Sequence, residues 1–103
     1  MRILRDCFGN SIRLTTERLE HIRLHPEMVD LETETGFALE SPNAARRPRT
    51  DTDVNLFYRF CRATIVGDKW LCVVAKRDST GAFVVTAYLT DKMKQGEDIW
   101  PTQ

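Results

Sequence analysis

The sequence predicts an α+β fold, in which an N-terminal β-hairpin and two helices pack on one face of an antiparallel meander sheet. Helical patterns occur only before Pro42, whereas strand-like runs separated by short turns fill the chain from Val54 onward. The 103 residues match the length of one domain, residues 1–103, which buries roughly 65% of its unfolded surface.

The N-terminal elements are predicted from turn, capping and breaking residues. Residues 2–7 and 11–14 are strand-like and flank Gly9, which suits a tight hairpin turn. A helix over residues 15–25 follows, because its two leading threonines can supply an N-cap. Pro26 disfavours helical geometry in the residue before it, so we expect the helix to end or bend there.

A second helix and a long loop are predicted next. The helix covers residues 28–39 and ends before Pro42. The polar segment 41–53, with two prolines and three arginines, is predicted to be a loop, and long loops of this kind are often functional or mobile. We expect its arginines to bind substrate: Arg46, Arg47 and Arg49.

Three strands joined by tight turns are predicted for the rest of the chain, over residues 54–66, 70–77 and 82–90. The middle run is apolar on both faces, as expected of a central strand. The last run alternates clearly, so its two faces are predicted to differ. Phe83, Val85, Ala87 and Leu89 are expected to meet the helices, and Ala82, Val84, Thr86, Tyr88 and Thr90 to share an accessible face.

Composition excludes several classes of protein. Contents of 42% apolar and 29% charged residues are typical of a soluble globular chain, and no apolar run approaches the ~20 residues of a membrane span. The N-terminus lacks the apolar segment of a secretion signal. Three cysteines without a Cys-x-x-Cys pair argue against a disulfide framework or a zinc knuckle, so the cytoplasm is the expected compartment.

Formal net charge is zero, but the charges are segregated along the chain. Residues 27–40 contain five acids and no base, whereas residues 46–77 contain eight bases and three acids. A neutral total is therefore compatible with a basic face that binds phosphates, and equally with two ordinary solvated surfaces.

The only two histidines, His21 and His25, lie four residues apart, a spacing that puts both on one side of a helix. Three interpretations are open. As metal ligands they need a third ligand, for which Glu27, Asp30 or a cysteine is available. As general acid and base they suit RNA transesterification. As ordinary helix-end residues they cap carbonyl groups.

RNA transesterification needs a base for the 2′-hydroxyl, an acid for the departing 5′-oxygen, and cations or hydroxyls around the phosphorane. Thr86 and Tyr88 are two residues apart in one strand, so both can donate to the same phosphate. The cations available are Arg59, Arg62, Lys76, Arg77 and Lys92.

Five short motifs follow one another between about Ile12 and Trp100: T-x-E-R-L-x-H-I-x-x-H-P-E-M, Y-R, V-V-x-K, F-V-V-T-A-Y and K-x-x-x-G-x-x-I-W. Their order resembles the phage barnase–EndoU–colicin–RelE-like nucleases, a family of small phage- and bacteria-associated proteins. The resemblance implies an α+β fold and metal-independent endoribonuclease activity that uses no cofactor. It also implies an active site on the open face of the sheet.

The resemblance also implies residue roles and partners. A helix histidine, His21 or His25, would act with a basic strand residue, Arg59 or Lys76. RNA would be the substrate. The protein would serve either as a toxin, with a cognate antitoxin protein as its partner, or as a mobile-element effector. The net charge of zero differs from that of ribosome-dependent toxins, which usually carry an excess of basic residues. Further phosphate contacts are expected from Thr86, Tyr88 and Lys92.

An alternative is a catalytically inactive module of the same fold that binds RNA or a protein through the arginines of segment 41–53. It predicts RNA binding that weakens steeply with salt, without cleavage. The sequence does not indicate the RNA target or the oligomeric state, and it gives no sign of a membrane partner.

Overall fold

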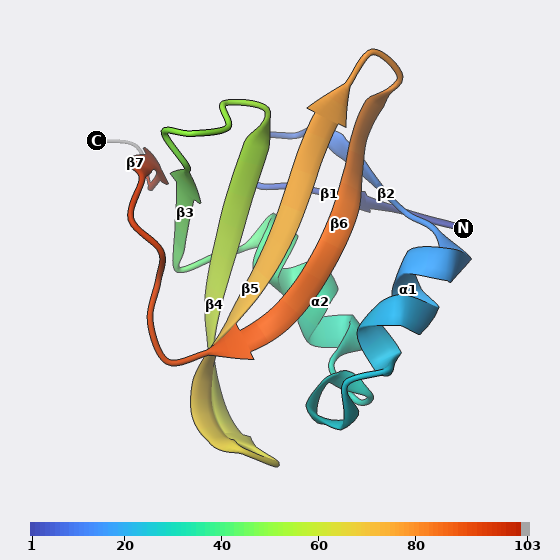
Figure 1. Ribbon diagram of the computed structural model, residues 1–103, viewed down its shortest axis with the longest axis vertical. Coiled ribbons are helices and arrows are strands. Elements are labelled where there is room, and N and C mark those ends of the chain that lie inside the picture. The colour runs from blue at the N-terminus through green and yellow to red at the C-terminus, as the bar shows by residue number, and fades with distance from the viewer. Residues whose placement is uncertain (102–103) are drawn as a thin grey trace.

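A computed structural model describes residues 1–101 (Figure 1). The predicted α+β order, with hairpin and helices before the main strands, is confirmed. In chain order the elements are β1 (Arg2–Arg5), β2 (Ser11–Leu14), α1 (Thr16–Arg23), the 3-10 turn η1 (Pro26–Met28), α2 (Glu32–Glu40), β3 (Ala44–Arg47), β4 (Val54–Thr64), β5 (Gly67–Asp78), β6 (Gly81–Thr90) and β7 (Glu97–Trp100).

The strands form one seven-stranded sheet in the order β1-β2-β6-β5-β4-β3-β7. The predicted meander β4-β5-β6 is its centre, and the N-terminal hairpin extends it, as expected. β2 joins β6 in parallel, whereas every other neighbouring pair is antiparallel. In Figure 1, α2 lies behind the central strands and α1 lies beside β6.

Capping and proline residues set the limits of the helices. Thr15 caps α1, since its hydroxyl accepts a hydrogen bond from the backbone N–H of Arg18 at 3.1 Å. α1 ends at Arg23, before His25 and Pro26, as the proline predicts. The second helix begins at Glu32, later than predicted, because η1 takes the residues after Pro26. In the described part of the chain no helix is long and apolar enough to cross a membrane.

The two faces of the sheet have different cores. On the helix side, Phe57, Leu71 and Val73 pack against Ile22 and Leu39 of the two helices. The opposite face, which we call the open face, carries a smaller buried cluster. Its members alternate with those of the helix-side core, which confirms a central strand that is apolar on both sides. They are Leu56, Tyr58 and Cys72, with Val54, Trp70, Val74, Tyr88 and Met93 packed around them.

A β-bulge in β6 changes the predicted alternation. The pairing of β6 with β5 shifts between Val84 and Thr86, which makes Val85 the extra residue. Val84 therefore joins Ala87 in the helix-side core, and Phe83 turns to the open face. The predicted faces of Ala82, Phe83 and Val84 are wrong, because the expected alternation assumed a strand without a bulge.

The prediction of a loop over residues 41–53 is wrong for Ala44–Arg47, which forms β3. β3 pairs with β4 on one side and with Glu97–Trp100, strand β7, on the other. β7 was not predicted from the sequence. Pro42 and Pro48 bracket β3, and a strand of four residues is too short for alternation to reveal it. Tertiary pairing with the free edge of β4 decides its conformation.

Candidate active site

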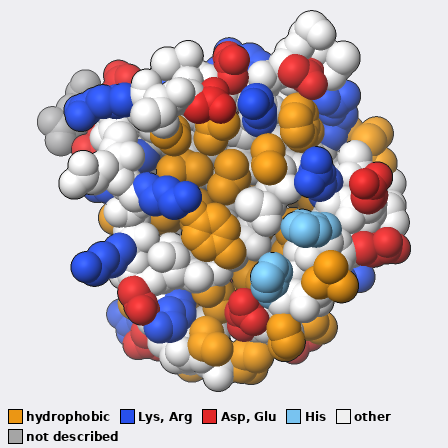
Figure 2. All heavy atoms as spheres, in the orientation of Figure 1, with side chains coloured by type: hydrophobic (Ala, Val, Ile, Leu, Met, Phe, Trp, Pro, Cys, Tyr) orange, Lys and Arg blue, Asp and Glu red, His pale blue; other side chains and the backbone are white. Residues whose placement is uncertain are grey.

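Both histidines of the chain lie on the open face. Figure 2 shows them beside a central apolar area, with Lys and Arg side chains on both flanks of that area. His21 belongs to α1, and His25 follows the helix immediately before η1. α1 and η1 both contact β6, and Figure 2 shows both imidazoles on this side of the molecule.

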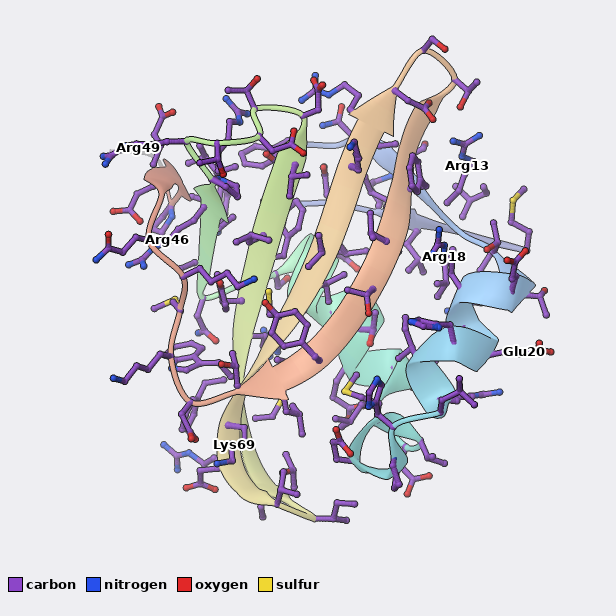
Figure 3. The ribbon with its side chains drawn as sticks, in the orientation of Figure 1. Arg13, Arg18, Glu20, Arg46, Arg49 and Lys69 are labelled. Carbon is purple, nitrogen blue, oxygen red and sulfur yellow. The ribbon has the colours of Figure 1, made fainter. Side chains whose placement is uncertain are left out.

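The rotation of α1 follows from its buried residue. Ile22 is buried in the helix-side core and fixes which side of the helix meets the sheet. Arg18 precedes His21 by three residues and so lies on the same side of the helix. Figure 3 shows Arg18 directed toward β6 and Glu20 directed away into solvent. The side chain of His25 is 59% exposed, and its Nδ1 lies 4.0 Å from a carboxylate oxygen of Glu27.

Thr86 and Tyr88 present their side chains on the open face, where Tyr88 pairs with Cys72 across the sheet. The Tyr88 hydroxyl is buried and has no hydrogen-bond partner among residues 1–101. Burial raises the pKa of Tyr88 well above its usual value, and the neighbouring Cys72 thiol and Tyr58 raise it further. The phenol therefore stays protonated at neutral pH.

Lys94 brings a cation to this face through the segment between β6 and β7. Its backbone N–H donates to the Tyr58 hydroxyl at 2.9 Å, and its Nζ lies 5.7 Å from the centre of the Tyr88 ring. Burial raises the pKa of Tyr58 to about 12, so this phenol is also neutral. Lys94 was not predicted as a site residue, because a loop has no alternation from which to infer its direction.

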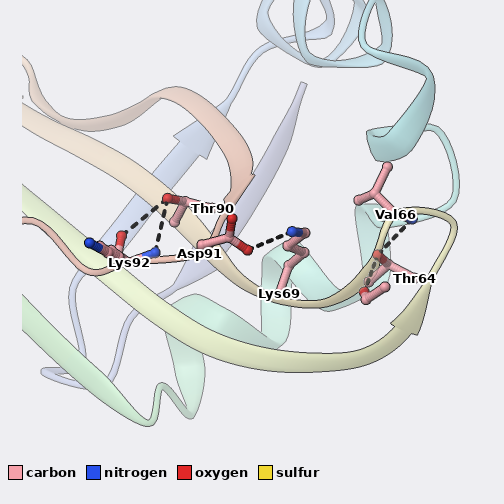
Figure 4. A network of polar contacts seen from close by, with 7 residues as sticks. Thr64, Val66, Lys69, Thr90, Asp91 and Lys92 are labelled. Atoms are coloured by element: carbon pink, nitrogen blue, oxygen red, sulfur yellow. Dashed lines mark hydrogen bonds and ion pairs between the residues drawn. The ribbon is translucent and has the colours of Figure 1, made fainter.

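The bend that redirects the chain after β6 is shown in Figure 4. The Thr90 hydroxyl donates to the carbonyl of Lys92 at 3.1 Å and accepts from its N–H at 3.3 Å. Asp91 forms an ion pair with Lys69 of β5. These contacts lead the chain toward Lys94 and its place over the sheet, while the side chain of Lys92 itself is exposed.

Two of the predicted cations lie on the open face. Arg46 pairs with Leu56 of β4, and its guanidinium contacts Asp98 and the carbonyl of Lys94, each at 2.9 Å. Lys76 lies nearer the other end of the face, with its Nζ 3.6 Å from a carboxylate oxygen of Asp51. Arg46 therefore holds the β6–β7 segment in place next to Tyr88.

The structure does not bring the other predicted arginines to Thr86 and Tyr88. Arg59 lies on the helix side, where its guanidinium donates to the carbonyl of Ser41 at 2.6 Å. Arg47 donates to the Asn55 side chain at 3.3 Å. Arg49 is exposed in the turn after β3 and points away from the sheet in Figure 3. Of the predicted alternatives Arg59 and Lys76, only Lys76 shares a face with Thr86.

Within residues 1–101, no three His, Cys, Asp or Glu side chains are grouped so that they could hold a metal ion. Comparisons with models of known protein families, with curated proteins and with solved structures found no match.

Proposed function

We propose that this protein is a metal-independent endoribonuclease that cleaves RNA by transesterification on its open face. The observation that carries the proposal is that four groups from distant parts of the chain share one face. His21 and His25 lie on the face that also carries Thr86 and Tyr88 (Figure 2). Lys94 adds a cation directly over Tyr88.

The two imidazoles supply the proton transfers of this reaction. One takes the proton of the 2′-hydroxyl, whose oxygen then attacks phosphorus, and the other protonates the departing 5′-oxygen. The products are a 2′,3′-cyclic phosphate end and a free 5′-hydroxyl end. Imidazole suits both roles because it accepts and donates protons near neutral pH. His21 is oriented by α1, whereas His25 lies beyond the end of the helix and next to Glu27.

The hydroxyls and the lysine stabilise the charge that develops on the phosphorane. Thr86 donates a hydrogen bond to its oxygens, and the protonated phenol of Tyr88 joins it when bound substrate uncovers the hydroxyl, which is buried in this structure. The ammonium of Lys94 offsets the added negative charge, and it is more effective beside an apolar cluster than in open water. Such an enzyme would suit a toxin with a cognate antitoxin.

The test is incubation of purified protein with a labelled single-stranded RNA in the presence of EDTA. We expect products that end in 2′,3′-cyclic phosphate, and we expect His21→Ala or His25→Ala to slow their formation by roughly 100- to 10,000-fold. Glu20→Ala is the matched control, since Glu20 lies in the same helix and points away from β6. This variant should cleave at the wild-type rate.

Two outcomes would contradict the proposal: no cyclic phosphate ends with the wild-type protein, or wild-type cleavage by both histidine variants. Salt-sensitive RNA binding without cleavage would favour the alternative, an inactive RNA-binding module.

A further inference from the structure

A hollow of about 350 Å³ adjoins the candidate active site, between β2, the start of α1 and the first half of β6. Five of the residues that line it decide its chemistry. Phe83 supplies an aromatic ring, Arg13 and Arg18 supply guanidinium groups, and Glu17 and Asp78 supply carboxylates. None of the five was predicted as a site residue.

The aromatic ring reaches this hollow because of the bulge at Val85. Ile12 and Leu14 of β2 are buried in the helix-side core, so Arg13 between them points to the open face. Phe83 is in parallel register with Arg13, and the guanidinium carbon lies 5.8 Å from the centre of its ring. Without the bulge, Phe83 would be directed into the core.

Neighbouring side chains hold Arg13 in this place. Its guanidinium donates to the Thr80 hydroxyl at 2.9 Å and lies 4.0 Å from the carboxylate of Asp78. That carboxylate also accepts from the backbone N–H and the hydroxyl of Thr80, at 2.7 and 2.6 Å. The guanidinium and the ring beside it are therefore arranged before any ligand arrives.

The charges of the hollow favour a neutral planar ligand over a phosphate. Met1 also lines the hollow; among the side chains, two guanidinium groups are matched by two carboxylates, so the side chains exert no net attraction on an anion. The carboxylates can accept hydrogen bonds from N–H groups, and the guanidinium groups can donate to ring nitrogen or carbonyl oxygen. An aromatic ring with donors and acceptors at its edge describes a nucleobase, which stacks on exposed aromatic side chains.

The hollow and the candidate catalytic groups follow each other along the boundary between α1 and β6. Arg18 lies three residues before His21, and Phe83 lies three residues before Thr86, so both elements pass directly from the hollow to the catalytic groups. Phe83 pairs with Lys76 and Thr86 with Val74, two residues apart on β5, so at about 3.3 Å per strand residue Phe83 and Thr86 lie roughly 7 Å apart along the sheet. Figure 3 shows Arg13 and Arg18 following each other along this boundary.

We propose that this hollow is a base-binding subsite that takes an unpaired nucleobase next to the cleaved phosphate, stacked on Phe83. The subsite rests on the proposed function and adds to it a requirement for single-stranded substrate. A base in a duplex is already stacked and paired, and cannot enter the hollow.

The subsite can be tested by binding, independently of cleavage. The probe is a fluorescent eight-nucleotide RNA with methylated 2′-hydroxyls, which cannot undergo transesterification, measured by fluorescence anisotropy. We expect Phe83→Leu to raise Kd roughly 10-fold. Phe37→Leu is the matched control, because Phe37 is 50% exposed and the Arg59 guanidinium carbon also lies 5.8 Å from its ring centre, on the helix side. It should change Kd less than about 2-fold.

An abasic probe with the same phosphates separates stacking from other effects, since it should bind wild type and Phe83→Leu equally. The subsite is overturned if wild type does not bind the probe, if Phe83→Leu binds it like wild type, or if Phe37→Leu weakens binding as much. It is also overturned if the Phe83 effect persists with the abasic probe.

Cleavage of natural RNA by the same proteins distinguishes the two proposals. Phe83-dependent binding by a wild-type protein that does not cleave contradicts the endoribonuclease and retains a nucleobase-binding hollow. If the wild-type protein cleaves RNA and Phe83→Leu binds the probe like wild type, the subsite is contradicted and the endoribonuclease is retained.

Discussion

At the scale of single residues, the hydroxyls of two tyrosines on the open face, Tyr58 and Tyr88, differ in their hydrogen bonding. The Tyr58 hydroxyl accepts the backbone N–H of Lys94, whereas the buried Tyr88 hydroxyl has no partner in the described part of the chain. Leaving a buried hydroxyl unpaired costs about 1–3 kcal/mol. A group of this kind needs an explanation, and a ligand oxygen that reaches the hydroxyl once it is uncovered provides one.

We therefore predict that Tyr88→Phe separates stability from activity. The free energy of unfolding should stay equal or rise by about 1 kcal/mol, because the unpaired hydroxyl is removed and the ring remains. RNA cleavage should fall at least about 10-fold, because one donor to the phosphorane is lost. Urea unfolding and the cleavage assay measure the two effects.

Tyr58→Phe is the comparison for this variant. It removes the acceptor of the Lys94 N–H and should lower the free energy of unfolding by about 1 kcal/mol. The interpretation of Tyr88 would be wrong if Tyr88→Phe proved as destabilising as Tyr58→Phe while cleaving RNA normally.

At the scale of elements, the bulge and the short strands mark the limit of prediction from sequence. Thr15 and Pro26 bound α1 through local chemistry, so that helix was predictable. The bulge at Val85 has no such signal, because the residues around it are all compatible with a regular strand. β3 and β7 likewise become strands through pairing with each other and with β4, which no local pattern encodes.

Gly96 shows how closely the start of β7 approaches β3. A Cβ atom at this position would lie 2.6 Å from the carbonyl oxygen of Arg47. We predict that Gly96→Ala lowers the free energy of unfolding by about 1–3 kcal/mol, because the backbone of β3 or β7 must shift. Thermal or urea unfolding measures this change.

Gly36→Ala is the opposite case and serves as the control. A Cβ there would meet only the Leu4 side chain, at 3.9 Å, and Gly36 lies inside α2. Alanine should stabilise the protein by about 0.5–1 kcal/mol, because it loses less backbone entropy on folding. Equal effects of the two substitutions would show that the close approach at Gly96 has no influence on stability.

At the scale of the whole molecule, the sheet separates the face covered by the helices from the open face, where we propose that the chemistry takes place. The sequence was sufficient to predict the α+β order and to place Thr86 and Tyr88 on the same face of one strand. It was insufficient for Arg59, whose direction depends on the register of β4 with β5, and for Lys94, which is positioned by Arg46 and Tyr58. The direction of a side chain and the register of a strand depend on tertiary contacts. For this reason helices and strands were easier to predict than the residues of the candidate site.

The phenol of Tyr58 and the thiol of Cys7 predict that the protein loses stability at alkaline pH. Burial raises the pKa of Tyr58 from 10.0 to about 12 and that of the Cys7 thiol from 9.0 to about 11. The unfolded chain therefore releases these protons at lower pH than the folded protein does. The free energy of unfolding should be level below pH 9 and fall from there toward pH 12.

Urea unfolding at intervals between pH 8 and pH 12 measures this trend, and Tyr58 should account for a decrease on the order of 2 kcal/mol across pH 10 to 12. The slope above pH 10 should be shallower in Tyr58→Phe, which has no proton to release there. A constant or rising free energy of unfolding over this range would contradict the assignment.

The parallel pairing of β2 with β6 also has a consequence for how the protein is made. It joins Ile12 to Ala82, so the N-terminal hairpin and α1 cannot take their final places until β6 has been synthesised. A ribosome adds roughly 5–20 residues per second, so these segments wait for several seconds without their partner strand. The histidines and the strand hydroxyls meet only after that wait, and a growing chain that lacks β6 has no assembled candidate site.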